Sequence, residues 1–215
     1  MVELFSAPES AHRYVLDEVR RADRDRFLAA LFAPEPQRRG LMALLALDHE
    51  LARTGSVTRE PMLARIRLQW WRDAVAEAAG EGKPRSQPVV ESLSETIRAR
   101  GLPVRRFIDL IDAREEEVEG ALDVVRAGHA LADLQLAVLA VTGEASRRAA
   151  RAVGAAWLMG AGPEREALLT EARSQRGAID PAALPILLPA RLLDRTWTPW
   201  QKPLVLWWAA HRRYY

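Results

Sequence analysis

The sequence predicts an all-α protein. Apolar residues recur at helical spacing along most of its 215 residues, and no segment shows a sustained alternation of apolar and polar residues bounded by hairpin turns. Glycine and proline separate the periodic segments. Because 49% of the residues are apolar and the chain has no internal repeat, we expect residues 1–215 to form one helical domain around one core.

The expected helix boundaries follow from capping residues, proline and glycine. Ser6 to Glu9 has the form of a capping box with a proline inside the first turn, which starts the first helix. Three prolines, at 181, 185 and 189, keep any helix there short. The other boundaries are read from similar signals. The expected helices span about residues 7–32, 35–53, 60–79, 89–100, 103–112, 118–141, 145–159 and 165–173, with a last helix that ends near 213.

Composition excludes several classes of function. The chain has no cysteine, which rules out disulfides, thiolate nucleophiles and cysteine-ligated zinc. Its 31 basic residues comprise 29 arginines and 2 lysines, a bias typical of GC-rich codon usage and therefore of a bacterial source. The net charge of +2 creates no strong field, so we expect no nucleic-acid partner.

The distribution of apolar residues bears on location. No uninterrupted apolar stretch reaches about 18 residues, the length that a membrane-spanning helix needs. Residues 1–13 lack an apolar core flanked by basic residues, so we expect no signal peptide. These patterns predict a cytoplasmic protein, with peripheral contact to the inner membrane as an added expectation.

Asp48 and His49 lie on an otherwise apolar helix. Asp48 follows Leu44 by one turn and therefore points toward the apolar face, and His49 follows Leu45 in the same way. A buried acid needs a partner and has a shifted pKa. Two interpretations remain: a remnant polar site in a central cavity, or an ion pair with an arginine of a neighbouring helix. We predict no metal site, because adjacent helical residues diverge by about 100°.

Two adjacent tryptophans mark the helix expected from residue 60. Leu63, Ile66 and Trp70 share a stripe with Ala74, which predicts that Trp70 lies in the core. Two neighbouring side chains on a helix cannot face the same core, so we expect the other tryptophan to line a cavity or an interface.

Aromatic and basic residues alternate near the C-terminus. The candidate membrane or partner interface comprises Trp200, Trp207, Trp208, Arg212 and Arg213. Tryptophan and arginine together suit a membrane–water boundary or a protein interface. The alternative is a terminal helix that docks on the bundle and closes its cavity.

Two blocks of sequence resemble the squalene/phytoene synthase family. The first runs from Asp25 to Arg39 and contains Phe27-Leu28-Ala29, and the second is Arg67-Leu68-Gln69-Trp70-Trp71-Arg72-Asp73. The resemblance implies the isoprenoid synthase bundle with a central prenyl-binding cavity. Tryptophan walls suit a prenyl chain, and arginines suit a diphosphate. The candidates are Arg53 and Arg72 for the diphosphate, and Phe27, Leu45, Asp48, His49, Trp70, Trp71, Gln135 and Trp157 for the cavity lining.

The chain departs from the family at its acidic motifs. Where the family carries its first aspartate cluster, residues 47–56 hold Ala52, Arg53 and Ser56. At the second, Trp157 stands about where a glutamine is expected, and residues 160–163 break the helix. In the family these carboxylates hold the Mg²⁺ that neutralises the leaving diphosphate. The chain is therefore similar to a divergent branch without intact aspartate motifs, which includes the complex I assembly factor with a squalene/phytoene synthase domain.

Three functions follow from this resemblance. The leading hypothesis is a protein without catalytic residues or cofactor that binds or assembles other proteins, with respiratory-complex components as partners. The second is an active prenyltransferase that uses Mg²⁺ and a non-standard diphosphate site built on Arg53, Arg72 and Glu164. The third is a prenyl-lipid carrier that keeps only the cavity.

Overall fold

The computed structural model describes residues 7–57, 60–120, 122–212 and 215, with the backbone alone described at residues 7, 8, 55–57 and 119. Every extended regular element in this part of the chain is a helix, so the all-α prediction is confirmed. The helices are α1 (Ala7–Ala22), α2 (Arg24–Ala30), α3 (Glu35–Val57), α4 (Pro61–Ala79), α5 (Pro88–Arg100), α6 (Val104–Glu119), α7 (Val124–Val138), α8 (Glu144–Leu158), α9 (Pro163–Ser174), α10 (Leu184–Leu187), α11 (Ala190–Leu193) and α12 (Gln201–Arg212), with 3₁₀ turns η1 (Arg176–Ala178) and η2 (Pro181–Ala183).

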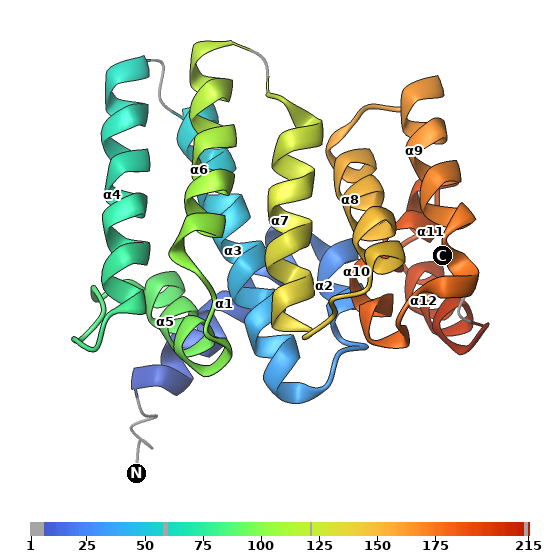
Figure 1. The fold of residues 1–215 in the computed structure, drawn as a ribbon, viewed down its shortest axis with the longest axis horizontal. Helices are drawn as coiled ribbons and strands as arrows, with labels where there is room; N and C mark the ends of the chain where they lie inside the picture. The colour runs from blue at the N-terminus through green and yellow to red at the C-terminus, as the bar shows by residue number, and fades with distance from the viewer. Residues whose placement is uncertain (1–6, 58–59, 121, 213–214) are drawn as a thin grey trace.

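A row of packed helices forms the front of the molecule in Figure 1. In this row α4 contacts α6, α6 contacts α7, α7 contacts α8, and α8 contacts α9. Helix α3 lies behind the row and packs against α1, α5, α6 and α7. The C-terminal helix α12 lies at the opposite end of the molecule from α4, against α2 and α11.

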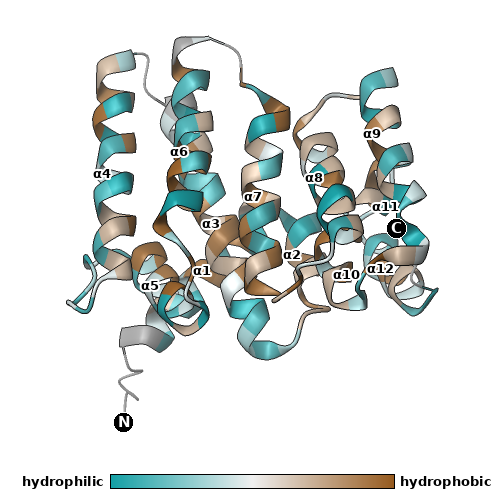
Figure 2. Ribbon diagram, viewed as in Figure 1, coloured by the Kyte–Doolittle hydropathy of each residue, from teal (hydrophilic) through white to brown (hydrophobic). Residues whose placement is uncertain are grey.

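Helix α3 forms the middle of the core. Residues 41–47 are all buried, and Figure 2 shows the hydrophobic colours concentrated there. An isolated amphipathic helix buries one stripe, but α3 has neighbours on several sides and so buries consecutive residues. Near α12 a smaller, separate cluster of apolar residues forms. It comprises Ala29, Leu188, Leu192, Leu206 and Ala209.

Two glycines let α7 and α8 approach backbone to backbone. A Cβ atom added to Gly128 would lie 2.4 Å from the backbone nitrogen of Ala155, and one added to Gly154 would lie 2.6 Å from the carbonyl oxygen of Gly128. Side chains larger than a hydrogen atom do not fit at this crossing. Both glycines also line a small cavity together with Leu41 and Leu45 of α3.

The structure corrects two expected helices. The helix expected over residues 7–32 is interrupted at Asp23, whose carboxylate caps α2 by accepting a 2.9 Å hydrogen bond from the Arg26 amide. The helix expected over residues 118–141 is also wrong. Helix α6 continues to Glu119, and α7 starts only after Asp123, which caps it in the same way. Asp23 lies in a stretch of charged residues and Asp123 between apolar ones, so neither cap leaves a clear break in the apolar pattern.

The length and hydropathy of the helices bear on membrane insertion. Among the described helices, none combines the length and the apolar character that a membrane-spanning helix requires.

Candidate functional site

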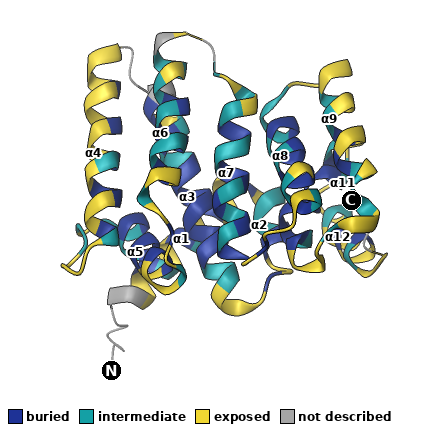
Figure 3. Cartoon of the chain, in the orientation of Figure 1, coloured by how far each residue is buried: buried dark blue, intermediate teal, exposed yellow. Residues whose placement is uncertain are grey.

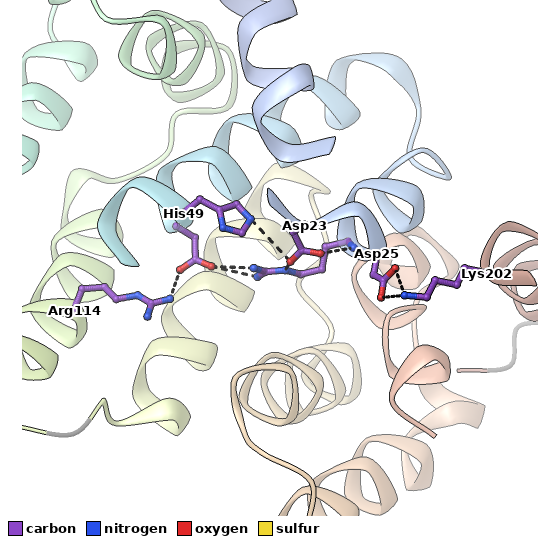
Figure 4. A network of polar contacts seen from close by, with 7 residues as sticks. Asp23, Asp25, His49, Arg114 and Lys202 are labelled. Atoms are coloured by element: carbon purple, nitrogen blue, oxygen red, sulfur yellow. Dashed lines mark hydrogen bonds and ion pairs between the residues drawn. The ribbon is translucent and has the colours of Figure 1, made fainter. Parts of the chain in front are cut away.

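A network of buried charges lies where α2, α3 and α6 meet (Figure 4). The Asp48 carboxylate on α3 accepts a 2.7 Å hydrogen bond from Arg114 of α6 at one oxygen. Its other oxygen accepts two bonds of 3.2 Å from Arg26 of α2. Asp48 is 2% exposed. The ion pair with arginines of neighbouring helices, one of the two interpretations of Asp48, is therefore confirmed.

The network extends on both sides of Asp48. Arg26 also donates through Nε to Asp23, the residue that caps α2. Arg114 bonds to Glu117 at 3.2 Å. The His49 Nε2 atom lies 4.0 Å from the Asp23 carboxylate and has no hydrogen-bond partner within the described residues. Carboxylate and guanidinium groups thus alternate through the centre of the bundle.

The pKa values of the buried groups follow from this alternation. Burial acts to raise the pKa of Asp48, but the charges of Arg26 and Arg114 outweigh it and hold that pKa below its ordinary value. Burial and the nearby Arg26 charge lower the pKa of His49. At neutral pH, Asp48 is therefore ionised and His49 is neutral.

This arrangement does not fit a divalent cation. Both oxygens of Asp48 are engaged by guanidinium groups, and Ala52 and Arg53 follow it on α3 where the family has acids. The Ser56 side chain lies outside the described residues. The described side chains bring no three His, Asp or Glu residues into a group that could hold a metal ion. Mg²⁺ needs several converging oxygen ligands, which these residues do not supply.

The central cavity of the bundle is almost filled. Its volume is ≈ 30 Å³, whereas sites for drug-sized ligands measure roughly 300–1,000 Å³. Three of the predicted lining residues, Leu45, Gln135 and Trp157, do surround it, together with Arg26. The Arg26 guanidinium lies 5.7 Å from the centre of the Trp157 ring. Phe27 packs against the main core instead.

A larger groove lies outside the bundle centre, between α3 and α4. It has a volume of ≈ 600 Å³ and is lined by Glu50, Arg53, Thr54, Arg67, Trp70, Trp71 and Gln87. The groove brings together three predicted residues from two helices, Arg53 of α3 and the two adjacent tryptophans of α4. Arg53 bonds to Glu50 at 2.8 Å on its own helix. The tryptophan rings are edge to face, with centroids 5.0 Å apart.

The prediction that Trp70 lies in the core is wrong. Trp71 is the buried member of the pair at 5% exposure, and Trp70 is 36% exposed. The face of α4 that packs on the bundle carries Ala64, Leu68, Trp71, Ala74, Val75 and Ala78. Of the predicted stripe, Ala74 lies on that face, whereas Leu63, Ile66 and Trp70 lie beside it and are exposed. Met62 is exposed as well, and Figure 3 shows how much of this helix is uncovered.

Arg72 does not join Arg53 in the groove. It points toward α6, where it donates to Asp112 at 2.7 Å and also to Glu115. The two candidate diphosphate ligands therefore lie in different surroundings, each with its own carboxylate partner. A bidentate clamp made of both arginines is not formed.

The sequence reasoning missed Arg26 and Arg114, the partners of Asp48. A signal for Arg114 was present, because it continues the buried helical series Phe107, Leu110 and Ile111. A charged residue on such a stripe has to meet an opposite charge in the core. Arg26 carried no comparable signal, since its neighbours Arg24 and Asp25 are also charged.

The C-terminal candidates lie on the surface. Trp200, Trp207 and Trp208 are exposed, and the Arg212 guanidinium lies 5.5 Å from the centre of the Trp208 ring. Arg213 lies outside the described residues. Helix α12 does dock on the bundle, through Leu206, Ala209 and the bond of Lys202 to Asp25. Its tryptophans nevertheless point away from the central cavity.

The chain is similar in sequence to one protein family and to several known proteins. The family model for squalene/phytoene synthase matches residues 19–159. The chain is 31% identical over 112 residues to a rat protein named NADH dehydrogenase (ubiquinone) complex I, assembly factor 6, which covers 52% of this chain and 33% of that protein. The Drosophila melanogaster homolog of this factor is 29% identical over 119 residues, covering 53% of this chain and 36% of that protein. The matched part thus spans about a third of these relatives' length. The chain belongs to the squalene/phytoene synthase family.

Proposed function

We propose that this protein is a non-catalytic member of its family that acts in the assembly of a respiratory NADH dehydrogenase. The observation that carries the proposal is the filled bundle centre, where two arginines bind Asp48 and the cavity measures ≈ 30 Å³. The role in assembly is suggested by the rat and fly relatives, which are both named as complex I assembly factor 6 or its homolog. Because the match spans about a third of those proteins, the role itself is part of the proposal.

The charge balance of Asp48 supports the loss of prenyl-transfer chemistry. Ionising an allylic diphosphate releases an anion that the family neutralises with Mg²⁺. An ion that bound Asp48 here would have to displace Arg26 and Arg114. It would leave their charges unpaired in a buried position, which is strongly unfavourable.

The main test is genetic. Deleting the gene in its source organism, which we infer to be a bacterium, is expected to lower the amount of assembled NADH dehydrogenase, measured on native gels and as NADH oxidation by isolated membranes. Succinate oxidation serves as the control and is expected to stay constant. Unchanged NADH dehydrogenase levels in the deletion strain would contradict the assembly role.

An assembly protein needs a surface that binds its partner. We propose that this surface is the exposed α4 stripe, defined as Met62, Leu63, Ile66 and Trp70. A row of apolar residues one turn apart, beside a groove, suits the apolar face of a partner helix. The double variant Met62→Ser/Ile66→Ser is expected to fold but not to restore NADH dehydrogenase in the deletion strain. Val125→Ser, which removes an exposed apolar residue from α7, is the matched control and is expected to restore it.

A second candidate function is the binding of a prenyl diphosphate or prenyl lipid in the α3–α4 groove. The groove favours it because Arg53 and two tryptophans share a volume of ≈ 600 Å³. Purified protein would be incubated with farnesyl and geranylgeranyl diphosphate, Mg²⁺ or Mn²⁺, and with or without NADPH. Pyrophosphate and C30 or C40 products above the control without enzyme would overturn the non-catalytic proposal.

Binding without turnover would support the second candidate alone. In that case Arg53→Ala is expected to weaken binding of the diphosphate. A prenyl lipid carried through purification would be seen by native mass spectrometry. If Arg53→Ala restores NADH dehydrogenase in the deletion strain as well as the unchanged protein does, diphosphate binding is not needed for the assembly role.

We also propose that the protein works on the cytoplasmic face of the inner membrane, as a peripheral protein. The exposed tryptophans and arginines of the C-terminal segment support this location. Fractionation of cells into membrane and soluble extracts, with and without a high-salt wash, tests it.

A further inference from the structure

Helix α12 presents an apolar surface at one end of the molecule. We call it the α12 surface and define it by its exposed residues Leu31, Phe32, Trp200, Leu204, Trp207 and Trp208. Two grooves flank the helix and meet at Leu204. One groove has a volume of ≈ 370 Å³ and is lined almost wholly by apolar side chains, including Phe32 and Trp207. The other has a volume of ≈ 350 Å³ and adds Arg191 and Arg195 to Trp197 and Trp208.

The same helix is divided into a docked face and an open face. Leu206 and Ala209 are buried in the small cluster of apolar residues beside α2 and α11, and Lys202 binds both oxygens of Asp25 (Figure 4). Leu204, Trp207 and Trp208 point the other way, into solvent. Three large apolar side chains lie on the open face of one helix, and two more, Leu31 and Phe32, lie in the turn that follows α2. Together they make a patch of the kind that monomeric proteins rarely expose without a use.

The charge around this patch is positive. Residues 195–215 contain Arg195, Lys202, Arg212 and Arg213, and no aspartate or glutamate. Two acids beside this segment are paired within the protein. Asp25 binds Lys202, so this pair carries no net charge, and Asp194 accepts from both Arg173 and Arg191. The surplus positive charge of the segment therefore comes from its arginines.

Two exposed arginines stand beside tryptophan rings. The Arg195 guanidinium lies 3.8 Å from the centre of the Trp197 ring, and that of Arg212 lies 5.5 Å from the centre of the Trp208 ring. The contact holds each cation next to the aromatic group. In a bilayer, tryptophan lies at the level of the headgroups, so these cations would be held at the level of the phosphates.

We propose that the α12 surface docks on a bilayer that contains anionic phospholipid. Trp207, Trp208 and Leu204 enter the boundary between headgroups and acyl chains, the two grooves accept apolar chain segments, and Arg195 and Arg212 bind phosphate. Positive charge with aromatic residues on an amphipathic helix suits such a surface. A second copy of the chain fits less well, because it would bring the same positive surface against its own. The proposal deepens the membrane location given under the proposed function and rests on it.

Flotation with purified full-length protein tests the proposal. One set of vesicles is phosphatidylcholine alone, and the other is phosphatidylcholine with phosphatidylglycerol. We expect flotation with the anionic vesicles, weakening as salt is added. Leu204→Ser/Trp207→Ser is expected to abolish it. Arg195→Gln/Arg212→Gln is expected to weaken it by roughly fivefold for each arginine, or roughly 30-fold for the pair.

The matched control removes an exposed apolar residue elsewhere. Val125→Ser on α7 is expected to float like the unchanged protein. All three variants change exposed side chains, so their circular dichroism spectra and urea midpoints are expected to stay constant. Quenching of tryptophan fluorescence by brominated phosphatidylglycerol, reduced in Trp207→Phe, would locate the contact at the α12 surface.

Several results would overturn the proposal. One is failure of the unchanged protein to float with either vesicle, and another is equal flotation of Leu204→Ser/Trp207→Ser. A molecular mass in solution that falls from dimer to monomer in that variant would assign the surface to a second copy. These assays use only protein and lipid, so they are independent of NADH dehydrogenase levels in cells. If the protein floats and the deletion strain is normal, the assembly role fails and the lipid surface stands.

Discussion

Arg114 of α6 donates a 2.7 Å hydrogen bond to the Asp48 carboxylate of α3, although 66 residues separate them in sequence. Both side chains are buried, at 4% and 3% exposure. Together with Arg26 they occupy the place where three helices meet. The centre of this fold is thus held by a structural ion network, which accounts for an aspartate buried among apolar residues of α3.

Replacing Asp48 is expected to destabilise the protein strongly. Asp48→Asn keeps the shape of the side chain but leaves the charges of Arg26 and Arg114 without a counter-charge. Breaking a buried ion pair in this way costs about 3–5 kcal/mol. Urea denaturation followed by circular dichroism measures the change in the free energy of unfolding. Glu144→Gln, which removes an exposed partner of Arg147, is the control and is expected to cost less than about 1 kcal/mol. Equal effects of the two variants would mean that water reaches the network.

The glycine crossing of α7 and α8 is expected to reject even one methyl group. Gly128→Ala would place its Cβ atom 2.4 Å from the backbone nitrogen of Ala155, so the helices have to move apart. Forced expansion of a packed core costs about 1–3 kcal/mol or more. Gly82→Ala, whose Cβ atom would have no neighbour within 4 Å, is the matched control and is expected to change stability little. A lowered thermal midpoint in both variants alike would argue against a close crossing.

The two adjacent tryptophans are expected to differ in their contribution to stability. Trp71→Ala empties a buried position, and such truncations cost about 3–5 kcal/mol. Trp70 is 36% exposed and contributes mainly its edge-to-face contact with Trp71 and its contact with Arg85, so Trp70→Ala is expected to cost less than about 1.5 kcal/mol. Urea midpoints of both variants check this order. The reverse order would mean that α4 is rotated about its axis relative to the described packing.

Stability is expected to fall as the pH decreases below about 6.5. The folded state lowers the pKa of His49 from its ordinary value of 6.5, chiefly by burial. Below that value the unfolded chain binds a proton before the folded chain does, so the free energy of unfolding decreases with falling pH. One such group contributes a slope of at most about 1.4 kcal/mol per pH unit.

Two other histidines act in the same direction. The pKa values of His12 and His129 are also lowered by burial. His49→Gln is therefore expected to reduce the slope between pH 7 and pH 5, measured by urea denaturation at each pH, without removing it. An unchanged slope would show that His49 takes up its proton equally in both states. The contribution of Asp48 belongs to a separate window, because its lowered pKa means that its stabilisation is lost only below its ordinary value of 3.8.

The apolar periodicity and the proline and glycine residues were enough to predict helices throughout and most of their boundaries. Pro61 opens α4 and Gly101 ends α5 as expected, because these residues act on the backbone locally. Asp23 and Asp123 were missed, since an aspartate caps a helix only where its own backbone leaves the helical conformation, as it does at both residues. An aspartate in the sequence does not by itself show whether the backbone does so.

The candidate site could also be predicted from the sequence only in part. The sequence showed that Asp48 faces an apolar surface and that acids are missing where the family has them, because both are properties of single positions on a helix. It did not show that Arg114 reaches Asp48, that Arg72 turns to Asp112, or that Trp71 and not Trp70 is buried. These outcomes depend on how α3, α4 and α6 are rotated against each other, and rotation is decided by the packing of whole helices.

The chain alone therefore determined the helices, the family and the loss of the acidic motifs. The tertiary structure decided that the centre of the bundle is filled by an Arg–Asp–Arg network and Trp157, while open grooves remain beside α4 and α12. The physical reason is that a pattern along one helix records which side chains share a face. Which neighbour covers that face, and how much space is left, depends on contacts between residues far apart in the sequence.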